Sequence, residues 1–239
     1  MKLRPVALLV VLVTAPTLAL AGCGTALDVR VGDPTTQQRE VADVTGVSLA
    51  ATGDLNLSVG AVPSLSITAG EHIIDRITSD VRDGVLVLDL DGPGWNNPGV
   101  ITYDLVLPAV DTITVDGAGD IDADLARGEA LAVYLDGAGD VTARGVDVGE
   151  LTVEVTGAGD VRLEGTAERQ RVAIDGVGEY DGTALASRQA DVSIGGAGDA
   201  HVNVTDALDA TVDGVGSITH SGGARVTSQI SGMGDVGPA

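Results

Sequence analysis

The sequence is poor in aromatic residues and in cysteine. Phe is absent, Trp occurs once and Tyr three times in 239 residues, and Cys23 is the only cysteine. A hydrophobic core must therefore be built from Val, Ile, Leu and Ala, and no disulfide within the chain can stabilise it. Gly is abundant, with 34 residues, but it lacks the period of three that marks a collagen triple helix.

Basic residues are also scarce. The chain holds 13 Lys and Arg against 35 Asp and Glu, for a net charge of −22, and Lys2 is the only lysine. So acidic a chain repels nucleic acids and anionic lipid head groups, which excludes nucleic-acid binding as a function. The composition suits an exported, solvated protein that attracts cations.

A targeting segment is predicted at residues 1–22. Lys2 and Arg4 precede an apolar run that ends in Leu20-Ala21-Gly22, directly before Cys23. This order resembles the lipobox of bacterial lipoproteins, in which the cysteine becomes the lipid-modified first residue of the mature chain. The alternative is an ordinary signal peptide, or an uncleaved anchor, with an incidental cysteine. Cleavage before Cys23 removes two basic residues and changes the net charge from −22 to −24.

The remaining chain divides into a tether and a folded body. Residues 23–42 are polar with little periodicity, and we expect them to form the lipidated cysteine and a flexible tether. From about residue 43, alternating segments such as GVSLAATGDLNLSV, VLVLDLDG and VITYDLVLP predict β-strands, and GPGWNNPG predicts a loop. We therefore assign residues 43–239 to one β domain.

A repeat occupies the second half of this domain, from about residue 113. Its Gly-x-Gly motif begins at seven positions, 18 to 20 residues apart: Gly117, Gly137, Gly157, Gly176, Gly196, Gly214 and Gly232. An approximate period with small slips is typical of stacked structural repeats.

Three columns of residues emerge when the copies are aligned. Branched aliphatic residues stand two positions before the first glycine: Val115, Leu135, Val155, Ile174, Ile194, Val212 and Ile230. The residues between the glycines are Ala118, Ala138, Ala158, Val177, Ala197, Val215 and Met233. Two positions after the second glycine stand Ile121, Val141, Val161, Tyr180, Ala200, Ile218 and Val236. We expect the chain to bend at Gly-x-Gly, with all three columns inside and the following acid, such as Asp120, pointing outward.

Stacking such units predicts an all-β fold, a right-handed parallel β-helix (solenoid) with coils of about 20 residues. Each strand then pairs with its copy in the next coil, about 4.8 Å away, and aliphatic ladders fill a narrow interior with little room for rings. The alternative fold is a twisted β-sandwich, which does not require columns in register.

The strands GVSLAATGDLNLSVG, VRDGVLVLDLDG and VITYDLVLP, followed by VDGAGDI and its copies, resemble the head GIN domain family of auto-transporter adhesins. The resemblance covers roughly residues 43–239. It implies a right-handed β-helix of the pectin-lyase kind, a location on bacterial surfaces, an adhesive role and no catalytic residues. The copies here carry Ala, Val or Met where the family's triplet has Ile.

Two kinds of binding site are considered at the Gly-x-Gly motif. A phosphate loop needs a helix after the glycines, but here another strand, IDADLA, follows. The second candidate is a weak Ca²⁺ site at the acids that follow the motif. Stacked carboxylates repel one another, and a bound Ca²⁺ ion would relieve this repulsion. The acids are Asp120, Asp140, Asp160, Glu179 and Asp199. The competing interpretation is that each acid is a solvated turn residue that accepts N–H groups of its own loop.

Catalysis has weaker support in the sequence. None of the three histidines lies in a zinc pattern or a nucleophile elbow. The acids follow the repeat, one per coil, whereas an active site usually interrupts a repeat. We therefore expect no catalytic residue and no cofactor, with a polysaccharide lyase or hydrolase as the alternative.

Trp95 is the remaining candidate contact residue. It lies in a loop rich in Pro, Gly and Asn, where an exposed ring can stack on a sugar or anchor a protein contact. Alternatively, Trp95 folds back and caps the coil stack.

The function expected from the sequence is binding or adhesion at the cell envelope. The protein is expected to be exported, to be held on the cell membrane by lipid on Cys23, and to face the cell exterior or the envelope space. A regular stacked surface suits an extended partner, such as a polysaccharide or a cell-surface protein. A further alternative is a structural homo-oligomer formed through the last coil, near ISGMGDVGPA.

Overall fold

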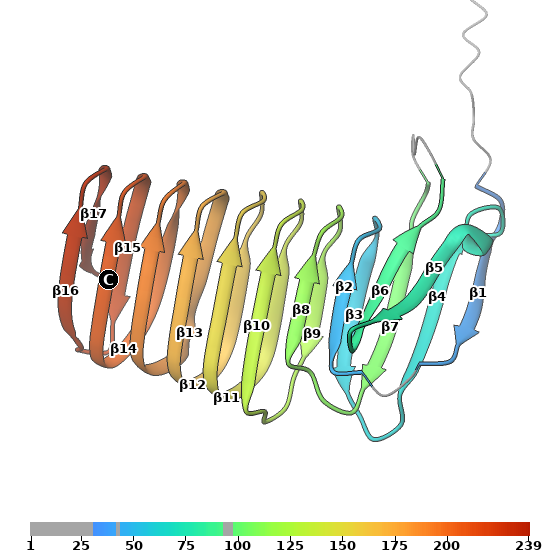
Figure 1. Ribbon diagram of the computed structural model, residues 1–239, viewed down its shortest axis with the longest axis horizontal. Helices are drawn as coiled ribbons and strands as arrows, with labels where there is room; N and C mark the ends of the chain where they lie inside the picture. The colour runs from blue at the N-terminus through green and yellow to red at the C-terminus, as the bar shows by residue number, and fades with distance from the viewer. Residues whose placement is uncertain (1–30, 42–43, 93–97) are drawn as a thin grey trace, which may run out of the picture.

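The computed structural model describes residues 31–41, 44–92 and 98–239, so Cys23 and Trp95 lie outside the described residues. The described chain forms one 17-stranded sheet wound into a solenoid (Figure 1), with a single short 3-10 helix and no α-helix. No helix in these ranges is long and apolar enough to cross a membrane. The elements are β1 (Pro34–Arg39), β2 (Gly46–Leu49), β3 (Asp54–Val59), β4 (Ser64–Gly70), η1 (Ile74–Arg76), β5 (Ile77–Arg82), β6 (Val85–Leu90), β7 (Thr102–Leu107), β8 (Thr112–Val115), β9 (Ile121–Asp124), β10 (Ala130–Leu135), β11 (Val141–Val155), β12 (Val161–Ile174), β13 (Val177–Ile194), β14 (Ala197–Val212), β15 (Val215–Ser221), β16 (Arg225–Ile230) and β17 (Met233–Pro238).

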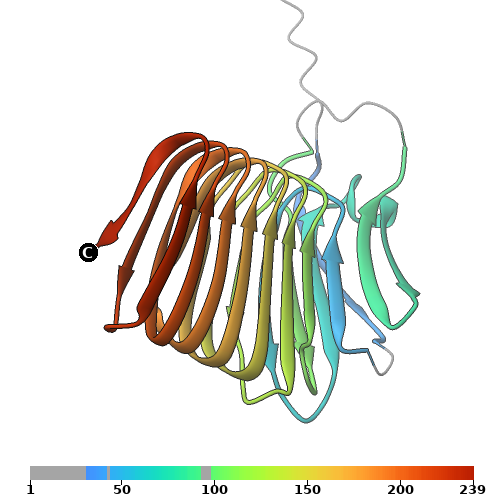
Figure 2. The ribbon, with the colours of Figure 1, turned by 60° about the vertical axis from the view of Figure 1, so that its left-hand side comes forward.

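Parallel pairing between successive coils confirms the predicted β-helix. Val153 in β11 pairs with Val133 in β10 on one side and with Val172 in β12 on the other, at separations of 20 and 19 residues. Figures 1 and 2 show the chain rising on one side of the stack, crossing over and descending on the other as it advances, which is a right-handed coil. The predicted coil length of about 20 residues is therefore confirmed.

Two long sides of the solenoid carry the strands. Face A consists, from the N-terminal end, of β5, β6, β2, β8, β10, the later parts of β11 to β14, and β16. Face B consists of β1, β4, β7, β3, β9, the earlier parts of β11 to β14, β15 and β17. The seven Gly-x-Gly motifs join face A to face B at one corner of each coil from β8–β9 to β16–β17.

The N-terminal part departs from a simple solenoid. The coil made by β2 and β3 lies between the coils β6–β7 and β8–β9, so spatial order differs from chain order. Antiparallel strands β1, β4 and β5 close this end of the stack. Because β1 occupies residues 34–39, the ordered body begins inside the segment predicted to be a tether.

An eighth corner, which the sequence repeat does not reveal, lies in the N-terminal coil. Thr52 forms a parallel bridge with Ala118, so the tripeptide at residues 51–53 stands where later coils have Gly-x-Gly. Its first residue is Ala51 rather than glycine, which explains why the pattern in the sequence begins only at Gly117.

The expected direction of the residue between the glycines is wrong. Ala118, Ala138 and Ala158 are exposed, and Val177 is 61% exposed. The glycines face inward instead, so plain alternation continues through the corner. The backbone of the preceding coil leaves no room for a side chain there: a Cβ on Gly157 would lie 2.6 Å from the carbonyl oxygen of Asp136 and closer still to that of Gly137.

The interior consists of aliphatic columns, as predicted. One column on face A contains Ile113, Val133, Val153, Val172 and Val192, each at most 1% exposed. Parallel in-register stacking buries β-branched side chains against their own copies, which stabilises the sheet by roughly 25 cal/mol per Å² of apolar surface.

Polar side chains interrupt these columns between β12 and β13. The hydroxyl of Tyr180 donates to Oε1 of Gln170 at 2.9 Å, and Nε2 of Gln170 donates to Oγ of Ser187 at 2.7 Å. All three residues are at most 2% exposed. Burial raises the pKa of the Tyr180 hydroxyl. Gly182 makes room for this ring, since a Cβ there would lie 2.8 Å from it.

Candidate binding surfaces

The Gly-x-Gly corners together form a ridge along the solenoid. We define the ridge by the outward residues of the eight corners: Thr52, Ala118, Ala138, Ala158, Val177, Ala197, Val215 and Met233. Towards the C-terminal end these side chains become larger, and Val215 and Met233 are 48% and 73% exposed. Acidic residues flank the ridge on both sides, so it offers methyl groups bordered by negative charge.

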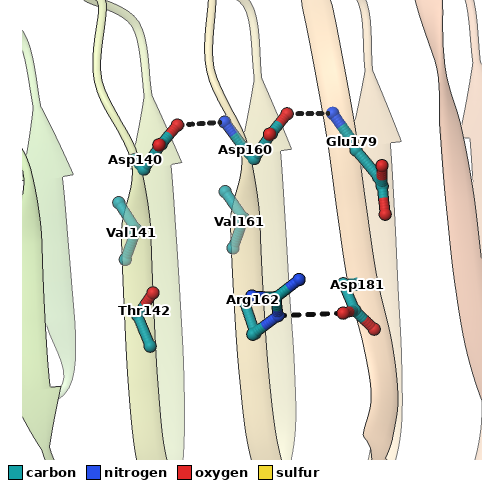
Figure 3. A pocket seen from close by; sticks show the side chains of 8 residues that line it. All are labelled: Asp140, Val141, Thr142, Asp160, Val161, Arg162, Glu179 and Asp181. Atoms are coloured by element: carbon teal, nitrogen blue, oxygen red, sulfur yellow. Dashed lines mark hydrogen bonds and ion pairs between the residues drawn. The ribbon is translucent and has the colours of Figure 1, made fainter.

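The acid column after the glycines links neighbouring coils. Oδ1 of Asp120 accepts the backbone N–H of Asp140 at 2.9 Å, Oδ1 of Asp140 accepts that of Asp160 at 2.9 Å, and Oδ1 of Asp160 accepts that of Glu179 at 2.8 Å. Figure 3 shows two of these bonds. Each acid therefore caps the next coil rather than its own loop, which gives the repeated aspartate a structural role.

Asp199 continues this arrangement one coil further. Its Oδ1 accepts both the backbone N–H of Ser217, at 2.7 Å, and the Ser217 hydroxyl, at 2.6 Å. These two bonds hold the pKa of Asp199 below its ordinary value. Glu179 turns instead towards His201, with Oε1 3.5 Å from Nε2.

The structure places the five acids proposed for Ca²⁺ in one row, one per coil. In the part of the chain that the structure describes, no group of three or more His, Cys, Asp or Glu side chains is placed to hold a metal ion. A Ca²⁺ site on this row therefore remains a prediction, with one carboxylate oxygen of most of its members already engaged.

Substitutions at Asp140 separate the structural role from calcium binding. Asp140→Asn keeps an oxygen that accepts the Asp160 N–H and should change the free energy of unfolding by no more than about 0.5 kcal/mol. Asp140→Ala removes the acceptor and should lower it by about 1 kcal/mol. The measurement is urea unfolding with and without millimolar Ca²⁺. A midpoint urea concentration that does not change with Ca²⁺ contradicts the calcium site, and equal losses in both variants contradict the capping role.

A shallow hollow of about 120 Å³ lies beside this acid column on face B. Figure 3 shows Arg162 reaching across it to Asp181, with Nε 2.9 Å from Oδ2. Burial alone would raise the pKa of Asp181, but hydrogen bonds from Thr183 and Arg162 lower it below its ordinary value. The hollow is therefore largely polar, and its Arg162 and Asp181 side chains are already paired with each other.

Ion pairs between neighbouring coils recur over the surface. Arg127 pairs with Asp147 at 2.9 Å, Arg169 with Glu150 at 3.1 Å, and Arg188 with both Glu168 and Asp206 at 3.3 and 2.9 Å. These exposed pairs contribute little individually, but they fix the few basic side chains in place between acids. The arginines are thus used to hold the stack together.

Face A carries an aromatic residue that sequence reasoning missed. Tyr134 occupies an outward position of β10 and is partly exposed, whereas Tyr103 and Tyr180 are fully buried. Its neighbours on the adjacent strands are Thr114 and Glu154. We call this outward surface, made by Thr112, Thr114, Ala132, Tyr134, Thr152 and Glu154, the Tyr134 patch. The alternating segment ALAVYL could have predicted this exposure, because Leu131, Val133 and Leu135 point inward and Tyr134 therefore points outward.

The titratable groups give little support to acid–base catalysis. Besides Asp181 and Asp199, Asp206 also has a lowered pKa, caused first by its hydrogen bond from Arg188. A general acid of a glycosidase needs a carboxyl group with a raised pKa.

Comparison with known proteins identifies close structural relatives. A "putative adhesin" from Bacteroides fragilis is 26% identical, with 87% of this chain and 97% of that one covered and a TM-score of 0.83. A "putative lipid binding protein" from Parabacteroides distasonis is 20% identical, with 87% and 97% covered and a TM-score of 0.70. A "putative adhesin" from Parabacteroides merdae is 21% identical, with the same coverage and a TM-score of 0.65. The last two, below 25% identity, show the fold alone.

The family itself is identified by sequence. No match was found among curated proteins. The family described as "Putative auto-transporter adhesin, head GIN domain" matches residues 43–224, which is most of the chain. This agrees with the resemblance carried by the strands and the Gly-x-Gly copies, and with an adhesin-like, non-catalytic role at the cell surface. The chain therefore belongs to the head GIN domain family.

Proposed function

We propose that the protein is an exported, lipid-anchored cell-envelope protein that binds an extended envelope polysaccharide through the Tyr134 patch, without catalysis. The observation that carries this proposal is the partly exposed Tyr134 in a flat sheet face. Aromatic rings stack on the apolar faces of sugars, and the neighbouring Thr112, Thr114 and Thr152 hydroxyls can bond to sugar hydroxyls.

The regular repeat of face A supports a long partner over a small one. Its side chains recur from strand to strand at about 4.8 Å over successive coils. Face B is less suitable in the coils around Tyr134, because the outward side chains of β3, β7 and β9 include Asp54, Asp104, Asp122 and Asp124, whereas β2, β8 and β10 on face A carry no acid. An acidic surface repels the many envelope polymers that are themselves anionic.

Binding should depend on the Tyr134 ring. Tyr134→Ala should weaken retention on purified envelope polysaccharide by about tenfold, whereas Tyr134→Phe, which keeps the ring, should retain it. Thr142→Ala, an outward change on face B, serves as the control. Equal affinity of the Tyr134→Ala variant and the original chain would place the binding surface elsewhere, with Trp95 the next candidate.

Anchoring is proposed to depend on Cys23. The lipobox pattern supports it, and β1, the first strand of the chain, lies at the closed N-terminal end of the stack (Figure 1). In host cells, the original chain should sediment with membranes, and Cys23→Ser should move it to the soluble fraction. Membrane association that survives this substitution contradicts lipid anchoring.

A further inference from the structure

The C-terminal end of the solenoid is open. Val226 and Ile230 in β16 continue interior columns, yet they are 38% and 44% exposed. Their partners one coil earlier, Leu208 and Val212, are fully buried. In the described chain no strand lies on the outer side of β16 or β17, so backbone hydrogen-bonding groups and core side chains are both uncovered.

The N-terminal end differs in both respects. There the antiparallel strands β1, β4 and β5 cover the last coil, and Ile74 and Ile77 are only 2% exposed. The outermost strands carry residues that discourage edge pairing, namely Pro34 in β1 and the charged Asp80 and Arg82 in β5. The open end therefore cannot be matched by the other end of a second molecule.

Charge distinguishes the open end from the rest of the chain. Residues 221–239 contain one basic and one acidic residue, Arg225 and Asp235, and are neutral overall, while the whole chain carries −22. Two such acidic bodies repel one another least when these ends meet. A neutral edge with exposed aliphatic side chains is thus complementary to a second copy of itself.

We propose that the open end pairs with the open end of a second copy about a two-fold axis. In such an arrangement β16 lies antiparallel to β16 of the partner copy, so their free backbone groups bond and their exposed core side chains are covered. Because the same surface is used on both sides, the assembly closes as a dimer and cannot grow into a filament.

If each copy is held in a membrane by its lipid anchor, as the proposed function requires, the dimer links two membranes. Strand β1 lies at the opposite end of the stack from β16 (Figure 1), so end-to-end pairing points the two N-terminal ends in opposite directions. Two copies anchored by their N-terminal ends then connect facing membranes. The partner for adhesion is, in this proposal, the same protein on another membrane.

Sedimentation of the full chain, produced without lipid, tests the pairing. We expect a concentration-dependent mass that reaches twice 23.9 kDa and no more, and tighter association as NaCl screens the acidic bodies. The double variant Thr227→Glu with Gln229→Glu places like charges on the outward side of β16, away from the core, and should raise the dissociation constant by about tenfold or more. The matched control, Ser193→Glu with Thr211→Glu, adds the same charge to inner coils in the column of Gln229 and should dimerise normally.

Vesicles provide the second readout. Coupling the Cys23 thiol to maleimide lipid in phosphatidylcholine vesicles replaces the natural anchor, so failure of natural lipidation does not affect this result. The original chain and the control should cluster vesicles, and the β16 variant should leave them dispersed. A monomer at all concentrations, a series of larger assemblies, or equal behaviour of both variants would overturn the proposal, provided that circular dichroism shows all chains folded.

Discussion

Replacing Gly157 by alanine should lower the free energy of unfolding by about 3 kcal/mol. The new Cβ would point into the corner, 2.6 Å from the carbonyl oxygen of Asp136 and against that of Gly137. Neither oxygen can move easily, because the Gly137 oxygen accepts the Ala158 N–H at 2.9 Å and the backbones of adjacent coils are in register. The measurement is urea unfolding followed by circular dichroism.

Gly128→Ala is the matched control for this substitution. Gly128 lies at another turn of the coil, where a Cβ would have its nearest neighbours at 3.7 Å and the backbone φ is not positive. The added methyl group should therefore change stability by less than about 1 kcal/mol, in the direction of stabilisation. If the two alanine variants unfold at the same urea concentration, the corners are not as tight as described.

Replacing Tyr180 by phenylalanine should lower the free energy of unfolding by about 1–3 kcal/mol. The change removes only the hydroxyl that donates to Gln170, at 2.9 Å, and leaves a fully buried amide oxygen without its donor. The free energy of unfolding falls because that oxygen stays desolvated without a hydrogen bond, and not because packing is lost. Thermal or urea unfolding measures it directly.

Two further variants assign this loss to the buried contact. Tyr134→Phe also removes a hydroxyl, but from a partly exposed outward position, and should change stability by no more than about 0.5 kcal/mol. In Tyr180→Phe combined with Gln170→Leu, both polar partners are gone, and much of the loss should be recovered. Comparable losses in Tyr134→Phe and Tyr180→Phe would contradict a special role for the buried bond.

The sequence was sufficient to predict the repeating part of the fold because one physical constraint recurs in every coil. A branched aliphatic residue and two glycines return every 18 to 20 residues, followed by an acid in all copies but that of Ser217, and parallel in-register stacking turns such a period into columns. The interior position of Val115, Val141 and their copies up to Val212 and Ile218 is confirmed, whereas Ile230 in the last coil is 44% exposed. So is the outward direction of the acids such as Asp120.

Other features depend on contacts between coils that a single sequence does not reveal. The inward direction of the corner glycines arises from carbonyl oxygens of the preceding coil, and this forces Ala118 and its copies outward. Strands β2 and β3 lie between coils that come later in the chain. An alternating segment predicts a strand, but it does not specify which other strand that strand pairs with. Each acid accepts the backbone N–H of the next coil, and this partner can be identified only when the register between the coils is known.

The candidate binding surface was only partly accessible to sequence reasoning. Trp95 attracted attention because it is the sole Trp, and it lies outside the described residues. The sequence does not separate Tyr134 from the other two tyrosines, whereas the structure shows that those two are buried and Tyr134 is not. The open C-terminal end was suggested by its sequence, but the exposed fractions of Val226 and Ile230 are what characterise it.

Retention on polysaccharide tests the central claim of a non-catalytic binding protein most directly. The full chain, produced without lipid, is passed over immobilised polysaccharide purified from the envelope of its own host, and the eluate is assayed for released sugar. The account predicts retention that is about tenfold weaker in Tyr134→Ala, with no sugar released. Release of sugar would establish a carbohydrate-active enzyme instead, and absence of retention would contradict a polysaccharide partner.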